Sequence, residues 1–198
     1  MRVLIIRFSS LGDIFQALEA AGTLADSGAV EFVDWLTRED FAPLLENQKS
    51  IRTVIPFSRR SSVLELVALA WRLAPRYDHV YDAHSNLRSF IVRTAIRLRW
   101  GFRHRSIVVR SKERLRRFMF FRLRLRTLPQ PYRGAESYVR PLRKWLPDLV
   151  PDFSKVSWTA PALHGSQVMT QFQAWKSRDT APVIALAPSA AWPNKRWP

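Results

Sequence analysis

The first twenty residues of this chain constrain its fold more strongly than any other segment. Four branched apolar residues at positions 3–6 are followed by a polar turn containing Gly12 and Asp13, and then by a second apolar run at positions 14–18. An uninterrupted branched apolar run favours a strand that is buried on both faces, as in a parallel sheet covered by helices. The chain is therefore predicted to open with a strand, a tight turn and a helix.

The polar residues of this turn allow two interpretations. Ser9, Ser10 and Asp13 stand where the first strand ends, and open α/β sheets bind their ligands outside the carboxyl ends of strands. The same residue types are also ordinary helix N-caps, which accept hydrogen bonds from free backbone N–H groups. A ligand site and a helix cap both remain open from these residues alone.

Further along the chain, short apolar runs alternate with segments of helical periodicity. Strands are expected at residues 30–36, 53–56, 80–83 and 107–109, and helices at 41–48, 63–73, 87–97, 134–146 and 167–178. Strands separated by helices of this length indicate right-handed parallel βαβ units. The predicted fold class is thus α/β, with a Rossmann-like doubly wound parallel sheet.

The last residues of the chain repeat the strand-and-turn pattern. An apolar run at 183–187 leads into a small-residue turn with Ser189, and the pair Lys195-Arg196 follows. Backbone N–H groups and a cation can face one phosphate in such a turn. This end of the chain is therefore a candidate anion site.

Four ordered motifs together resemble glycosyltransferase family 9, the lipopolysaccharide heptosyltransferases. They are Ser-Ser-Leu-Gly-Asp at 9–13, the segment from Tyr77 to Ser89, Arg-Trp-Gly-Phe at 99–102, and Lys-Arg-Trp-Pro at 195–198. The resemblance implies the amino-terminal half of a GT-B type, two-domain enzyme. Residues 1–165 would form an acceptor-binding domain, and residues 166–198 a linker helix with the start of a nucleotide-sugar-binding domain.

The resemblance also implies a reaction and its residues. It is the inverting transfer of a heptose or related sugar from a nucleotide-diphosphate sugar to an anionic glycolipid, the inner core or lipid A of lipopolysaccharide, with no further cofactor. Asp13 would be the catalytic base, and Ser189 and Lys195 would bind the donor phosphates. The candidate acceptor-binding residues are Ser9, Ser10, Arg59, Arg60, Arg88 and Lys112, and Ser9 and Ser10 could instead orient Asp13.

The chain departs from the family pattern in three places. Gln16, Ala17, Leu18 and Glu19 stand where relatives usually carry His-Thr-Leu-Pro, so the His and the Pro are missing. Ser85 stands where glycine is common, which predicts a differently shaped turn. The family fold also has two Rossmann-like halves, and this chain reaches only the start of the second. We therefore expect the chain alone to be inactive, and an acceptor-binding pseudo-enzyme is an alternative.

The net charge is the other strong signal, because 32 Lys and Arg residues face 16 Asp and Glu residues, giving +16. Such a balance implies an anionic partner. Apolar and aromatic residues interleave with the later cations, so this region could lie on an anionic membrane surface, or be a solvated basic helix. A nucleic-acid-binding module is the competing function, although it is not favoured. The cations concerned are Arg88, Arg93, Arg97, Arg99, Arg103, Arg105, Arg110, Lys112, Arg114, Arg116, Arg117, Arg122, Arg124 and Arg126.

Several other features narrow the possible chemistry. The chain has no cysteine, and its four histidines lack helical ligand spacing, so no metal site is expected. No long apolar run or signal peptide is visible, which favours a cytoplasmic protein. The family resemblance implies that this protein is peripheral on the inner face of the bacterial inner membrane. Asp82 and His84 share a strand face but fit a structural role better than an acid–base pair. Trp192 and Trp197 could stack on a base or pack a domain interface.

Overall fold

The computed structural model describes residues 1–101, 105–111, 114–125, 134–151 and 167–176. The chain divides into two compact units, Met1–Pro161 and Ala162–Pro198. Within the second unit the described part is helix α6 (Gln167–Lys176), close to the helix expected at 167–178. The strand predicted at 183–187 lies outside the described residues.

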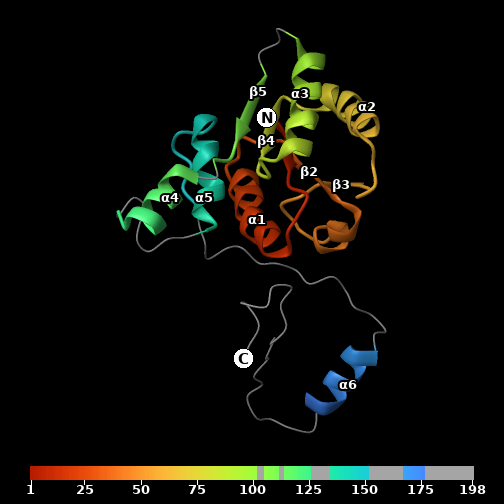
Figure 1. Ribbon diagram of the computed structural model, residues 1–198. Helices are drawn as coiled ribbons and strands as arrows, with labels where there is room; N and C mark the ends of the chain where they lie inside the picture. Colours follow the sequence, from red (N-terminus) through yellow and green to blue (C-terminus); the bar gives the residue numbers. More distant parts are fainter. Residues whose placement is uncertain (102–104, 112–113, 126–133, 152–166, 177–198) are drawn as a thin grey trace. The chain divides into compact units, whose positions relative to one another are not determined.

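The first unit is built on a parallel sheet of five strands (Figure 1). The strands are β1 (Arg2–Ile6), β2 (Phe32–Arg38), β3 (Thr53–Phe57), β4 (His79–Asp82) and β5 (Ser106–Val109). Their order is β3-β2-β1-β4-β5, and every neighbouring pair is parallel. The predicted α/β class with a doubly wound sheet is confirmed.

Helices cover both faces of this sheet, and the first strand shows why. Val3 and Ile5 join one core cluster with α1 (Leu11–Asp26) and α5 (Glu136–Val139). Leu4 and Ile6 point to the other face, toward α2 (Val63–Leu73) and α3 (Leu87–Trp100). Because side chains alternate along a strand, a run buried on both faces must be apolar at every position.

Two predicted helices take a different form. The segment expected as a helix at 41–48 is the 3₁₀ helix η1 (Glu39–Leu44), which contains Pro43. In place of the helix expected at 134–146, the structure has the single turn α5 followed by the 3₁₀ helix η3 (Arg140–Lys144). Pro141 is the second residue of η3. Proline lacks an N–H and clashes with the preceding turn, so an α-helix does not run through it.

The remaining helices lie close to their predicted places. Helix α2 has its predicted bounds, α3 continues three residues past Arg97, and the short 3₁₀ helix η2 (Ala74–Arg76) follows α2. The basic segment forms helix α4 (Arg114–Leu123). Within the described part of the chain, no helix combines the length and apolar character needed to cross a membrane.

Candidate active site

The predicted site residues that the structure describes lie at the carboxyl edge of the sheet. Strands β1 and β4 are neighbours in the centre, while β2 and β3 extend the sheet on one side and β5 on the other. The chain reverses its direction of strand addition between β1 and β4, and ligands of doubly wound sheets bind at such a switch point. Asp13 follows β1, and Arg88 follows β4 at the start of α3.

Asp13 lies in the first turn of α1, where three groups hold its carboxylate. Arg7 Nη2 is 2.5 Å from Oδ2, and the Ser10 hydroxyl donates to the same oxygen at 3.0 Å. The Tyr138 hydroxyl donates to Oδ1, also at 3.0 Å. The Asp13 side chain nevertheless keeps 42% of its surface exposed. It is thus fixed in position and still accessible to a ligand.

Ser10 occupies the N-cap of α1, but its side chain accepts no backbone hydrogen bond there. Its hydroxyl instead donates to the Asp13 carboxylate. Ser10 therefore stands at the N-cap position, but its side chain does not cap the helix. Ser9, which precedes it, is partly buried at the same turn.

Two buried arginines surround the ring of Tyr138. Arg7 is 5% exposed and donates from Nη1 to the carbonyl oxygen of Ala83 at 2.8 Å, while its guanidinium carbon is 5.6 Å from the ring centroid. Arg110 is 8% exposed, lies 3.7 Å from the centroid and donates to the Ser137 hydroxyl. These cations stabilise the ring and add positive charge beside Asp13.

The electrostatics of this cluster keep Asp13 ionised. Burial raises the pKa of Asp13, but the charge of Arg7 and the hydrogen bonds from Ser10 and Tyr138 outweigh it, so the pKa lies below its ordinary value. Burial raises the pKa of Tyr138 to about 12, which keeps the phenol protonated and able to donate. At neutral pH the site therefore presents a carboxylate that can accept a proton.

The structure brings two of the predicted acceptor-binding residues together. Arg88 donates from Nη1 to the carbonyl oxygen of Arg59 at 2.9 Å, which joins the start of α3 to the loop after β3. Arg59 and Arg60 are exposed in that loop, and Arg88 is partly buried. Three cations thus lie at the carboxyl edge that also carries Asp13, with neighbouring parallel strands about 4.8 Å apart.

Both carboxylate oxygens of Asp82 have structural partners. The Asp82 side chain is fully buried, and its Oδ1 accepts the backbone N–H groups of His84 and Ser85 while its Oδ2 accepts the Ser89 hydroxyl. Ser85 has a φ of 55°, a left-handed conformation that favours glycine. Asp82 therefore supports the turn that carries Ser85, which is a structural role.

Other predicted residues lie outside the described part of the chain. They are Lys112, Ser189, Lys195, Trp192 and Trp197. Among the described residues, no group of three acidic or histidine side chains is placed to hold a metal ion.

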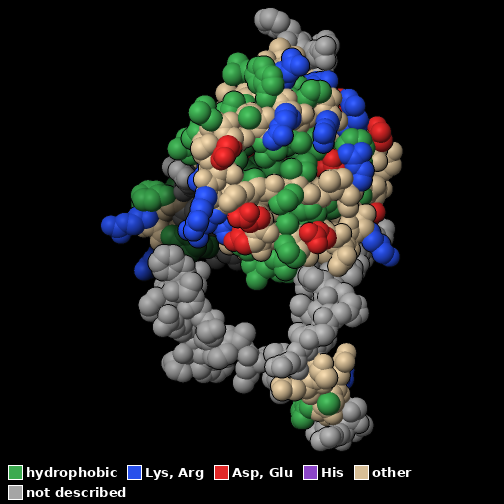
Figure 2. All heavy atoms as spheres, turned by 90° about the vertical axis from the view of Figure 1, so that its right-hand side faces the viewer, with side chains coloured by type: hydrophobic (Ala, Val, Ile, Leu, Met, Phe, Trp, Pro, Cys, Tyr) green, Lys and Arg blue, Asp and Glu red, His purple; other side chains and the backbone are tan. Residues whose placement is uncertain are grey.

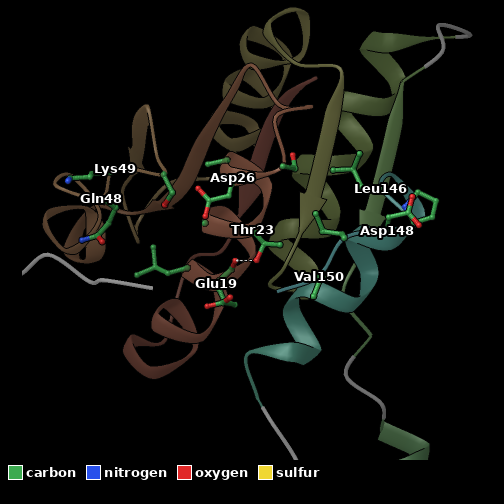
Figure 3. Close-up of a pocket in the computed structure, with 15 residues that line it drawn as sticks. Glu19, Thr23, Asp26, Gln48, Lys49, Leu146, Asp148 and Val150 are labelled. Atoms are coloured by element: carbon green, nitrogen blue, oxygen red, sulfur yellow. Dashed lines mark hydrogen bonds between the residues drawn. The ribbon is translucent and has the colours of Figure 1, made fainter. Parts of the chain in front are cut away.

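A separate hollow of about 830 Å³ lies away from this edge (Figure 3). It is lined by the second half of α1, by residues 48–50 and by residues 146–150. Helix α1 runs back from the carboxyl edge and residues 48–50 precede β3, so the hollow lies toward the amino ends of the strands. The Thr23 hydroxyl donates to the carbonyl of Glu19 within it. This hollow shares no residue with the Asp13 cluster.

Sequence reasoning missed the two residues that hold Asp13 most directly. Arg7 comes directly after the apolar strand. A charged residue at that position could have been recognised as a candidate site residue at the end of the strand. Tyr138 gave no such signal, because it is 125 residues from Asp13 in the sequence. Its position depends on the packing of α5 against α1. Gly134, just before α5, lies so close to Gln16 of α1 that a Cβ on Gly134 would be 2.5 Å from Gln16 Oε1.

Comparisons with known proteins find this architecture in solved structures of glycosyltransferases. No protein-family model and no curated protein sequence matches the chain. The solved structure of a family 9 glycosyl transferase from Veillonella parvula superposes with a TM-score of 0.66 at 16% identity, over all of this chain and 56% of that one. Two E. coli structures also cover all of this chain.

The first is heptosyltransferase WaaC with ADP-2-deoxy-2-fluoro heptose, with a TM-score of 0.56, 21% identity and 62% of that chain covered. The second is ADP-heptose lps heptosyltransferase II, with a TM-score of 0.53, 21% identity and 58% covered. The chain thus spans little more than half the length of these structures. Over that length it has the fold of family 9 glycosyltransferases, and the predicted resemblance is confirmed at the level of fold.

Proposed function

We propose that this chain carries the acceptor side of an inverting glycosyltransferase. The observation that carries the proposal is the Asp13 carboxylate, which is ionised, partly exposed and held at the switch point by Arg7, Ser10 and Tyr138. Similarity to structures of heptosyltransferases, one of them with an ADP-heptose analogue, supports a nucleotide-diphosphate heptose as the donor.

In the proposed reaction Asp13 removes the proton from an acceptor hydroxyl. The freed oxygen forms a bond to the anomeric carbon of the donor from the face opposite the leaving group. The bond from that carbon to the diphosphate oxygen breaks, and the nucleoside diphosphate leaves with the electron pair. The configuration at the anomeric carbon is inverted, and Asp13 ends protonated.

The acceptor we propose is an anionic glycolipid of the lipopolysaccharide core type. Arg59, Arg60 and Arg88 supply positive charge at the edge that carries Asp13, and planar guanidinium groups suit carboxylates and phosphates. Lys112 would add to this acceptor site, and Ser189 and Lys195 would bind the donor diphosphate. Because the fold neighbours are nearly twice as long, we expect this chain alone to bind acceptor without turnover.

The experiment is a transfer assay on the form of the protein that contains both domains. It would be incubated with an ADP-heptose and a lipid A-type acceptor, and the product analysed by mass spectrometry. We expect an acceptor one heptose heavier, with release of ADP. Transfer from none of several nucleotide-diphosphate sugars, by a protein that still binds ADP, would contradict the proposal.

A further inference from the structure

The outward side of α3 carries large apolar side chains. Leu87 is 75% exposed, Phe90 49% and Leu98 70%. Their spacing of three and eight residues places them along one side of the helix, while Val92 and Ile96 on the opposite side are buried in the core. A helix that covers a sheet normally turns polar residues to solvent, so this stripe needs an explanation.

Helix α2 has the same property. Leu64 is 81% exposed and Trp71 45%, and their spacing of seven residues puts them on one side of the helix. Leu66 and Ala70 face the core instead. Both helices of this layer are therefore apolar on their inner and their outer sides.

The two stripes belong to one surface. Helices α2 and α3 pack against each other on the same face of the sheet, and the Arg99 guanidinium carbon is 5.4 Å from the centroid of the Trp71 ring. Figure 2 shows hydrophobic side chains interleaved with Lys and Arg over the upper part of the side of the molecule where these helices lie. We define the α2–α3 outer face by Leu64, Trp71, Leu87, Phe90 and Leu98.

The charge on these two helices is almost entirely positive. The two helices contain five arginines and one acidic residue, and that residue, Glu65, accepts the backbone N–H of Ser62 in a capping box. Arg72, Arg97 and Arg99 are exposed, and the Arg93 guanidinium carbon lies 5.1 Å from the Phe90 ring centroid. Arginines that flank exposed apolar side chains fit the phosphates and acyl chains of an anionic bilayer.

We propose that the α2–α3 outer face is a docking surface for an anionic phospholipid bilayer. A second copy of the chain fits poorly, because two such faces would bring their arginines together. Nucleic acid also fits less well, since three of the five defining residues are leucines, which offer no ring for base stacking. The inference deepens the proposed function and rests on its lipid-linked acceptor.

Topology connects this surface to the candidate site. Helices α2 and α3 both follow strands that run in the same direction, so both begin at the carboxyl edge of the sheet. Leu64 and Leu87 lie in their first turns, and the Arg88 guanidinium in the first turn of α3 donates to the carbonyl of Arg59 in the loop that leads into α2. A bilayer on the outer face would therefore border the edge where Asp13 and the acceptor arginines lie.

Vesicle co-sedimentation of the full chain tests this surface without any sugar transfer. Vesicles of phosphatidylcholine alone would be compared with vesicles that also contain phosphatidylglycerol, at low and high salt. We expect the chain to bind the anionic vesicles preferentially. The variant Leu64→Ser/Leu87→Ser/Leu98→Ser should lower the partition constant by roughly tenfold or more, because its apolar contacts are lost.

Two further variants make the test specific. Arg72→Gln/Arg97→Gln should weaken anionic binding by roughly fivefold for each charge and reduce its salt dependence. Phe118→Ser/Phe121→Ser changes exposed apolar residues of α4, the rival basic segment, and should have little effect. All three variants replace exposed side chains, and circular dichroism melting curves would verify that the variants are folded.

The results that would overturn the proposal are distinct. The proposal is refuted if the chain binds neutral and anionic vesicles equally, or if it prefers duplex DNA. It is also refuted if the α4 variant loses binding while the triple leucine variant keeps it. A protein that binds anionic vesicles through this face but transfers no sugar would refute only the proposed function. A transferase whose leucine variant binds vesicles like the parent would refute only the docking surface.

Discussion

At the scale of single residues, the chemistry depends on how Asp13 is held. A carboxylate that must accept a proton benefits from a fixed position, yet strong partners lower its affinity for the proton. Arg7 and Tyr138 impose both effects, because each contacts one oxygen of the carboxylate. Asp13 nevertheless keeps part of its side chain exposed at the carboxyl edge of the sheet.

The Tyr138 hydrogen bond can be removed with little change in shape. In Tyr138→Phe the carboxylate loses a donor that favours its charged form, so we expect the pKa of Asp13 to rise toward its ordinary value. The measurement is an NMR titration of the Asp13 side-chain carboxyl carbon against pH.

Tyr81→Phe is the matched control for this titration. The Tyr81 hydroxyl donates to the Tyr138 carbonyl at 2.7 Å and is buried, so its loss should reduce the free energy of unfolding by about 1–3 kcal/mol. It should leave the pKa of Asp13 nearly unchanged. If both variants move that pKa equally, Tyr138 acts through packing alone and not through its hydrogen bond.

At the scale of elements, the two helices that follow β1 and β3 begin differently. At α2 the Ser62 hydroxyl accepts the N–H of Glu65, and the Glu65 carboxylate accepts the N–H of Ser62. At α1 the N-cap residue Ser10 directs its hydroxyl to Asp13 instead. One helix start is thus built for stability, while the other engages the candidate catalytic group.

Alanine substitution at these two N-caps should therefore give different results. Ser62→Ala should reduce the free energy of unfolding by about 1 kcal/mol, because a capping bond is lost. Ser10→Ala should change it by less than about 0.5 kcal/mol. Urea unfolding of the two variants measures both values. Equal destabilisation would show that Ser10 also caps its helix in solution.

The sequence predicted elements well where their signals are local. The strand at residues 3–6 and the helix at 63–73 could be predicted because burial on two faces and helical spacing leave direct patterns. The segment at 134–146 was wrongly expected to be one helix, since Pro141 divides it. Asp13 could be predicted from its motif, but Tyr138 could not, because its contact depends on the packing of α5 against α1.

At the scale of the whole molecule, the sheet gathers the parts of the proposed function at one edge. The strand order puts Asp13 and Arg88 on neighbouring loops at the switch point, and α2 and α3 start beside them. The basic composition alone is compatible with both membranes and nucleic acids, with nucleic acids the less favoured, and the position of the arginines supports the proposed membrane surface. The arginines lie around an acceptor edge and an apolar outer face.

The central claim, that Asp13 is the base for sugar transfer, is tested most directly by Asp13→Asn in the form of the protein that contains both domains. Asparagine keeps the shape of the side chain but cannot accept the proton, so kcat should fall by roughly a hundredfold or more. Asp78→Asn changes an arginine-paired, partly exposed carboxylate just before β4, at the amino ends of the strands, and should retain normal turnover. A steady-state assay with ADP-heptose and a lipid A-type acceptor, alongside a melting curve, compares the two. If Asp13→Asn turns over like the parent protein, Asp13 is not the base and the proposed mechanism is wrong.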